Sequence, residues 1–280
     1  MTKVYLNKRI TPRIAMGHPW IYNNEVDRIA GTVSPGDIVE VYYFDGQLAG
    51  RGYINPGSQI IIRLLTRKRE PIDAGFFHQK ISEAWAYRQQ LGYTENCRLV
   101  FGEADGLPAL IIDKFNDYFV LQTLSLGIEQ WKTAIVDAIN TIFKPKGIYE
   151  RNDVPVRELE GLEQKKDFLS DPFPTEIIIR ENGLQFYVDI EHGQKTGYFL
   201  DNDYFVELDK LIDQLNNDVI QHERDELKEQ NNVWFIIFLG SEWDEEQGKE
   251  YYIELCYLVV TEELLFDFIK SSIEILQCST

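Results

Sequence analysis

The side chains best suited to chemistry are basic and aromatic residues within the first 70 positions. Guanidinium groups bind phosphate oxygens through charge-assisted hydrogen bonds, and aromatic rings stack on unpaired bases. Together they could form an RNA-binding surface. Alternatively, Trp20 packs in the core and the arginines are merely solvated, and the residues alone leave both interpretations open. The candidates are Arg9, Arg13, His18, Trp20, Tyr22, Arg51, Arg63, Arg67, Lys68 and Arg69.

The charge of the chain is unevenly distributed. A net charge of −18 would by itself disfavour nucleic acid, because phosphates repel an acidic surface. Residues 1–69, however, hold ten Lys/Arg and five Asp/Glu, which gives +5. Residues 204–280 hold five Lys/Arg and eighteen Asp/Glu, which gives −13. The basic part fits contact with RNA, and the acidic part could either be solvated or dock onto the basic part and compete with RNA.

The first 70 residues must position most of these side chains, and their pattern predicts a small β-barrel. Alternating and β-branched runs separated by turn residues are typical of short strands. Gly50-Arg51-Gly52 lies between two such runs with no helix after it, so we interpret it as part of a hairpin, not as a nucleotide-binding loop. The predicted strands are 18–22, 38–43, 48–54 and 59–66, with a short helix opening at 11–13.

The next segment predicts an α/β domain over residues 71–180. Apolar residues at helical spacing follow Asp73, a good N-cap, and Gly92 closes that helix. Glu103 and Asp105 resemble a catalytic carboxylate pair, but Asp105-Gly106 is a turn dipeptide, which favours a structural role. The predicted helices are 73–91 and 129–143, the strands are 98–101, 110–112, 118–124 and 147–150, and a hairpin covers 176–190.

The last 78 residues differ in composition from the rest. All ten prolines lie at or before Pro174, and this segment is strongly acidic. Its pattern predicts an acidic α/β tail with helices at 204–229 and 261–276 and strands at 233–239 and 251–260.

The cysteines and the hydropathy pattern place the chain among soluble cytoplasmic proteins. Cys97, Cys256 and Cys278 form no metal-binding pattern, so we expect reduced thiols and no metal site. Cys278 lies among acidic residues, which is unfavourable for a nucleophilic thiolate. We expect no secretory signal and no membrane span, since the longest apolar run covers only residues 233–239.

Five phrases occur in the same order and at similar spacings as in a known family. They resemble the class I SAM-dependent 23S rRNA cytosine-C5 methyltransferases that carry a PUA domain, and they cover about seven-tenths of the chain. The phrases are Gly17-His18-Pro19-Trp20-Ile21-Tyr22, residues 49–60 (AGRGYINPGSQI), residues 102–113 (GEADGLPALIID), residues 148–153 (IYERND) and residues 188–201 (VDIEHGQKTGYFLD).

The resemblance implies an α+β multidomain fold. It implies a PUA-like RNA-binding barrel at 1–70, an α/β linking domain at 71–180 and the start of a methyltransferase domain at 181–202. In the family, the segment that contains Lys195, Thr196 and Asp201 lies beside the methyl donor SAM.

The match ends at Asp201-Asn202, and the acidic α/β tail at 203–280 stands in place of a complete Rossmann-like domain. Only Gly240 and Gly248 follow, so no glycine-rich donor loop and no catalytic residue can be assigned. We therefore expect this chain to bind no SAM and treat Lys195, Thr196 and Asp201 as vestiges of a donor site.

Three functional hypotheses follow. The first is a protein that binds rRNA or another structured RNA without catalysis, as a monomer or a homodimer. The second is an active SAM-dependent rRNA methyltransferase with a divergent C-terminal domain. The third is an interaction module in which the tail binds a partner or docks onto the basic barrel.

Overall fold

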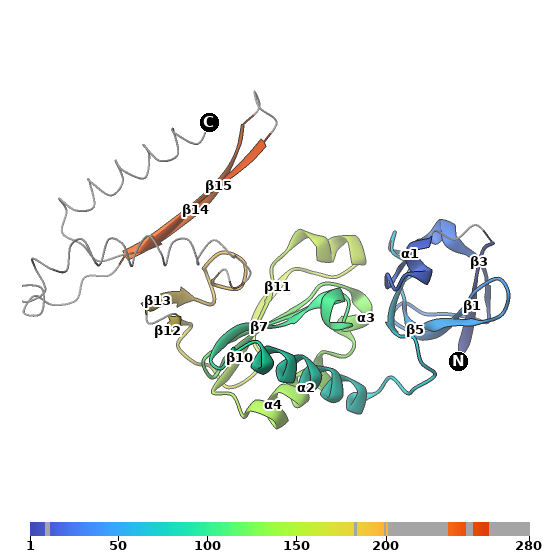
Figure 1. Cartoon of the computed structure of the whole chain (residues 1–280), viewed down its shortest axis with the longest axis horizontal. Helices are drawn as coiled ribbons and strands as arrows, with labels where there is room; N and C mark the ends of the chain where they lie inside the picture. The colour runs from blue at the N-terminus through green and yellow to red at the C-terminus, as the bar shows by residue number, and fades with distance from the viewer. Residues whose placement is uncertain (9–11, 182–183, 199, 201–234, 245–248, 258–280) are drawn as a thin grey trace, which may run out of the picture. The chain divides into compact units, whose positions relative to one another are not determined.

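The computed structural model describes residues 1–8, 12–181, 184–198, 200, 235–244 and 249–257. Contacts divide the chain into two compact units, Met1–Asn202 and Asp203–Thr280. The first unit contains a β-barrel followed by an α/β domain (Figure 1).

The barrel is a six-stranded sheet in the order β2-β6-β5-β4-β1-β3. β1 pairs in parallel with β4, and the other neighbours are antiparallel. The predicted strands at 38–43 and 48–54 are confirmed as β4 and β5, whereas β1 and β3 were not predicted. Its elements are β1 (Thr2–Leu6), α1 (Pro12–Ala15), β2 (Trp20–Ile21), a 3-10 turn (Asn23–Glu25), β3 (Val26–Ala30), β4 (Ile38–Tyr42), β5 (Leu48–Ile54) and β6 (Ile62–Thr66).

Alternation along these strands forms the barrel core. Val4 and Leu6 of β1 and Val39 and Val41 of β4 are buried together, so their intervening residues lie on the outer face. Gly50-Arg51-Gly52 lies within β5, which pairs antiparallel with β4 and β6, so the hairpin interpretation is confirmed, although the three residues lie inside a strand and not between two. A Cβ on Gly52 would lie 2.0 Å from the Arg63 carbonyl oxygen of β6, so this position requires glycine for the close approach of two backbones.

The α/β domain is a five-stranded sheet in the order β11-β10-β9-β8-β7, with β9 and β10 parallel and the other pairs antiparallel. The predicted helix at 73–91 is confirmed as α2 (Ala74–Gln90). Asp73 is its N-cap, since the Asp73 carboxylate accepts a hydrogen bond from the Phe76 backbone N–H at 3.0 Å. The other elements are β7 (Asn96–Phe101), a 3-10 turn (Gly102–Asp105), β8 (Leu110–Phe115), β9 (Tyr118–Thr123), α3 (Leu126–Glu129), α4 (Lys132–Phe143), β10 (Gly147–Asn152), a 3-10 turn (Pro155–Glu160) and β11 (Lys165–Phe168).

Both faces of this sheet are covered. On one face, Ile112 and Leu121 pack with residues of α2 and α4. On the other face, Phe115 and Val120 pack with the hairpin of β12 (Glu176–Glu181) and β13 (Leu184–Asp189), which confirms the hairpin predicted at 176–190. The segment after β13 is thereby held against the sheet.

In the second unit, the structure describes one antiparallel hairpin, β14 (Phe235–Asp244) and β15 (Lys249–Tyr257). These strands confirm the prediction of two strands in the tail, although their bounds differ from those predicted. The helices predicted at 204–229 and 261–276 lie outside the described residues.

Candidate functional site

Arg13, a predicted RNA contact, is used inside the barrel. Its guanidinium donates to the Glu25 carboxylate at 2.6 Å and to the Trp20 carbonyl oxygen at 2.7 Å, and it lies 4.8 Å from the Tyr22 ring centroid. Because Glu25 is buried, this ion pair anchors α1 to the turn before β3. RNA contact by Arg13 stays a prediction, which this geometry disfavours.

The guanidinium of Arg51 in β5 also contacts groups of the protein itself. Its guanidinium pairs with the Glu40 carboxylate of β4 at 2.6 Å and donates to the Glu70 carbonyl oxygen at 2.6 Å. The hydrogen bonds that Glu40 accepts, first from Arg51 and then from Tyr42, lower the pKa of the Glu40 carboxyl. Arg51 therefore stabilises the outer wall of the barrel.

Arg63 joins the barrel to the α/β domain. Its guanidinium donates to the Glu160 carboxylate at 2.8 Å, and the side chains are only 7% and 3% exposed. The same carboxylate accepts hydrogen bonds from Asn55 at 3.0 Å and Ser58 at 2.5 Å. The phrase at residues 49–60 therefore serves as a joint between domains.

Trp20 contributes to the same joint. It is partly buried and lies outside the core, and its indole N–H donates to the Glu103 carboxylate at 2.7 Å. Asp105 accepts a two-pronged hydrogen bond from Arg88 at 2.9 and 2.6 Å, and Gly106 has φ 70°. This geometry confirms the turn predicted at Asp105-Gly106 and gives both carboxylates structural partners.

The other predicted RNA-contacting residues lie at the surface. His18, Arg67, Lys68 and Arg69 are exposed, and Arg9 lies outside the described residues. The His18 Nδ1 accepts a hydrogen bond from the Trp20 backbone N–H at 3.2 Å, so its Nε2 edge is left for other partners.

The exposed surface of the barrel is basic. Glu25 and Glu40 are buried, which leaves fewer acidic groups outside than the sequence suggests. Within the described part of residues 1–69, the exposed acids are Asp27, Asp37 and Asp45, and the exposed cations are Lys3, Lys8, Arg28, Arg67, Lys68 and Arg69. This surface can attract a polyanion although the whole chain is acidic.

The loop after β13 contains the predicted donor-side residues. The Thr196 side chain is fully buried, and its hydroxyl donates to the Asp113 carboxylate of β8 at 2.6 Å. Asp113 also pairs with Arg98 at 3.0 Å. Lys195 is exposed with φ 52°, and Asp201 lies outside the described residues.

Arg151 of β10 fixes the backbone of this loop. Its guanidinium donates to the Ile190 carbonyl oxygen at 2.6 Å and to the Gly193 carbonyl oxygen at 3.0 Å. Gly197 has φ 112°, and a Cβ there would lie 2.7 Å from the Asp189 carbonyl oxygen. The phrases at 148–153 and 188–201 are therefore joined by direct contacts.

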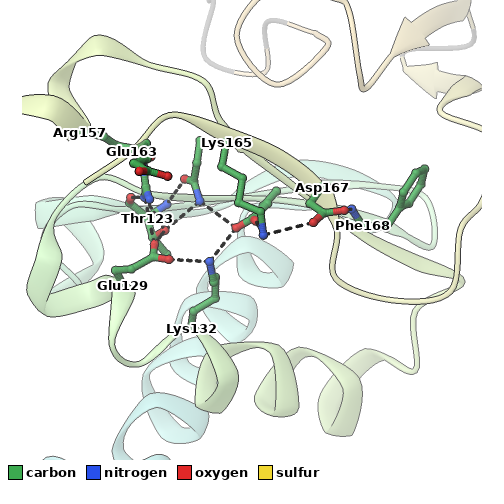
Figure 2. Close-up of polar contacts among 10 residues, drawn as sticks. Thr123, Glu129, Lys132, Arg157, Glu163, Lys165, Asp167 and Phe168 are labelled. Carbon is green, nitrogen blue, oxygen red and sulfur yellow. Dashed lines mark hydrogen bonds and ion pairs between the residues drawn. The ribbon is translucent and has the colours of Figure 1, made fainter. Parts of the chain in front are cut away.

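Glu150, the neighbour of Arg151, is fully buried and belongs to a network of charged side chains, of which Figure 2 labels Glu129, Lys132, Arg157 and Lys165. Its carboxylate pairs with Lys132 at 2.8 Å and with Lys165 at 2.9 Å. Lys132 also pairs with Glu129 at 2.5 Å, and Glu129 with Arg157 at 2.9 Å. Burial raises the pKa of Glu129, but hydrogen bonds from Lys132, Thr123 and Arg157 outweigh it, so the pKa is lowered. Each charge has an opposite partner, which indicates a structural role.

Sequence reasoning missed the residues that join these parts. Glu160, Asp113 and Arg151 were not singled out, and their partners lie 97, 83 and 39 positions away. Charged residues inside otherwise apolar strands, such as Asp113 in β8, are the signal that could have found them, because a buried charge requires a partner.

The fold and this surface define a protein with a small, basic β-barrel joined to an α/β domain. Residues 4–67 match the family model described as PUA-like domain. Over 203 residues, the chain is 41% identical to ribosomal RNA large subunit methyltransferase I of Aliivibrio fischeri. This match covers 71% of this chain and 51% of the relative. The protein of the same name from Escherichia coli O157:H7 is 38% identical over 189 residues, covering 66% and 48%.

The chain is therefore a homologue of ribosomal RNA large subunit methyltransferase I over about 70% of its length, and it spans about half the length of these relatives. The fold is similar to that of a solved protein from Streptococcus mutans described as a SAM-dependent methyltransferase, with TM-score 0.58 and 19% identity, covering 72% of this chain and 52% of the other. A methyltransferase solved in complex with SAH gives TM-score 0.59 and 18% identity, covering 72% and 51%.

Neither a membrane-spanning helix nor a metal-binding group of side chains occurs among the described residues. Among them, no helix has the length and apolar character that crossing a membrane requires. Within the same residues, no group of three or more His, Cys, Asp or Glu side chains is arranged to hold a metal ion.

Proposed function

We propose that this chain binds ribosomal RNA, or another structured RNA, through its barrel and does not itself methylate the RNA. The observation that carries the proposal is the sorting of charge in the barrel. Glu25 and Glu40 are buried, while six cations and three acids are exposed in the described part of residues 1–69. Homology to rRNA methyltransferases supports ribosomal RNA as the ligand class.

The test is binding of the full chain to a labelled RNA hairpin, followed by fluorescence anisotropy across a salt series. Phosphate contacts release counterions, so the logarithm of the association constant should fall linearly with the logarithm of salt concentration. A Lys68→Gln variant should weaken binding, whereas Lys146→Gln, which removes another exposed cation, in the α/β domain, should not. Absence of salt-dependent binding by the wild type would contradict the proposal.

The absence of methylation is supported by the loop of residues 189–198. The family chemistry needs SAM as methyl donor, but the Thr196 hydroxyl is committed to Asp113 and its side chain is fully buried, so it offers nothing to a ligand. The only glycines in the sequence after Gly197 are Gly240 and Gly248, and Gly240 lies inside β14. These residues do not fit a donor pocket of the glycine-rich type.

Calorimetric titration of the full chain with SAM tests this point. We expect no heat of binding from protein shown to be folded. Saturable binding at micromolar concentration would support the alternative, an active rRNA methyltransferase with a divergent C-terminal domain. In that case, cytosine C5 methylation would require a cysteine nucleophile, and Ser variants of Cys97, Cys256 and Cys278 would identify it.

The remaining partners follow from charge and composition. We place the protein in the cytoplasm, where its RNA would be found, and propose that the acidic tail docks onto the basic barrel of the same chain or of a second copy in a homodimer. Deleting residues 204–280 should then tighten RNA binding at low salt. Unchanged affinity would contradict tail docking, and light scattering would distinguish a monomer from a homodimer.

A further inference from the structure

The outer face of β1, β3 and β4 carries a column of stacked side chains. Strand register places Arg28 of β3 opposite Tyr5 of β1, and Tyr5 opposite Tyr42 of β4. Residues Val4 and Val41 point into the core, so their neighbours Tyr5 and Tyr42 point outward. Because β3 is the end strand of the sheet, Arg28 ends the column at the sheet edge.

The contacts within this column are close. The Arg28 guanidinium carbon lies 4.2 Å from the Tyr5 ring centroid. The rings of Tyr5 and Tyr42 are stacked, with centroids 5.5 Å apart and an interplanar angle of 24°. At the other end, Arg69 donates to the Tyr42 hydroxyl at 2.9 Å, and the Lys3 ammonium lies 5.6 Å from the Tyr42 ring centroid.

The two ends of the column differ in exposure. Tyr42 is 8% exposed, whereas the Arg28 side chain is 64% exposed. The Arg28 guanidinium lies over the Tyr5 ring, and most of the Arg28 side chain is exposed. A planar cation held on a ring can continue the stack with a nucleobase, because the guanidinium plane stacks on bases as aromatic rings do.

The charges around the column suit a nucleic-acid backbone. The cations Lys3, Arg28, Arg51 and Arg69 lie on this face with one carboxylate, Glu40, which is buried. Asp27 neighbours Arg28, but its carboxylate is 3.8 Å away and exposed, so the pair is weak. Lys3 and Arg69, both at the Tyr42 end of the column, can therefore contact phosphates of a strand that runs along this face from a base on Arg28.

We propose that this face binds single-stranded RNA by stacking an unpaired base on the Arg28 guanidinium, with Lys3 and Arg69 on phosphates of the strand toward the Tyr42 end of the column. The inference rests on the proposed RNA-binding function and specifies its ligand: an unpaired strand. A base inside a duplex cannot reach the column, since both of its faces are covered by neighbouring base pairs. The barrel thus distinguishes unpaired from paired RNA without reading the sequence.

Cross-strand stacking also stabilises sheets, so the test must separate ligand binding from stability. Arg28→Lys keeps the charge but removes the planar group, and its exposed position preserves the fold. We would measure fluorescence anisotropy of the full chain with a labelled single-stranded oligoadenylate and with a blunt RNA duplex of the same length. Thermal unfolding of each variant would verify the fold, and Lys146→Gln would control for loss of a surface charge.

We expect Arg28→Lys to weaken binding of the single strand roughly tenfold, the loss typical of one base-stacking contact, and to leave duplex binding unchanged. Equal affinity of wild type and Arg28→Lys for the single strand would overturn the stacking proposal. If Lys68→Gln still weakened binding of the RNA hairpin in that case, the proposed RNA-binding function would be supported without the stacking proposal. If the wild type bound none of the three RNAs, both would be overturned.

Discussion

Two regions of the barrel use arginine in opposite ways. At the joint with the α/β domain, Arg63 and Glu160 are 7% and 3% exposed and form a buried ion pair supported by Asn55 and Ser58. On the outer face of β1, β3 and β4, the Arg28 side chain is 64% exposed, and its guanidinium lies over the Tyr5 ring with no comparably buried carboxylate.

The difference shows that the position of the partner carboxylate decides what an arginine does. A buried carboxylate must be paired, because the desolvation of an isolated charge is costly, and the arginine that pairs with it is no longer available to a ligand. An arginine stacked on a ring keeps its charge and its outer face exposed. Charge counts along the sequence cannot separate these two roles.

The largest loss of stability is expected where Arg63 pairs with Glu160 between the barrel and the α/β domain. Glu160→Ala would leave Arg63 buried without its partner, which should cost about 3 to 5 kcal/mol of stability. Hydrogen–deuterium exchange of residues 48–66 would show faster opening of β5 and β6. Glu158→Ala, in the same 3-10 turn but exposed, is the matched control. Similar exchange rates in Glu160→Ala and Glu158→Ala would mean that the buried carboxylate contributes no more to stability than the exposed one.

A smaller loss is expected where Thr196 meets Asp113. Thr196→Val keeps the shape but removes the donor to a buried carboxylate, which should cost about 2 kcal/mol. The loss should appear as faster hydrogen exchange or proteolysis of residues 189–198, whereas Gln194→Ala, at an exposed position of the same loop, should leave both unchanged. If Thr196→Val protected the loop as well as wild type, the loop would be held by Arg151 alone.

The sequence predicted the elements whose signals are local. The Asp73 cap, the apolar stripe of α2 and the turn at Asp105-Gly106 are each specified within a few residues, and the structure confirms them. The parallel pairing of β1 with β4 joins residues about 37 positions apart through no local signal. The column of Arg28, Tyr5 and Tyr42 depends on that pairing, so it could not be predicted.

The site was predicted only in part for the same reason. The basic run at Arg67, Lys68 and Arg69 is exposed as its composition suggested, because three adjacent cations are hard to bury. Arg63 looks similar in the sequence, but its partner Glu160 is 97 positions away. The roles of such residues are fixed by tertiary contacts, which the sequence does not display.

Salt dependence would sharpen the contrast between exposed and buried arginines. The double variant Arg67→Gln, Lys68→Gln should weaken binding of the RNA hairpin about tenfold and lower the slope of log affinity against log salt by about 2, one for each lost phosphate contact. Arg63→Gln should reduce stability and leave that slope unchanged in the folded fraction. Equal slopes for the double variant and wild type would show that these cations do not contact phosphate.

Low pH should destabilise the outer face of the barrel even when no RNA is bound. Hydrogen bonds from Arg51 and Tyr42 lower the pKa of the Glu40 carboxyl below its ordinary value of 4.5. Because the folded pKa is the lower one, the carboxylate stabilises the fold fully above about pH 4.5, and this contribution is lost as pH falls through the folded pKa. Thermal unfolding between pH 6 and pH 3 should therefore show a fall in Tm that is smaller in Glu40→Gln than in wild type. Asp45→Asn, at an exposed hairpin turn, controls for the loss of one carboxylate. An equal fall in Glu40→Gln and wild type would mean that Arg51 and Arg69 gain no stability from Glu40, and the outer face would then depend on stacking alone.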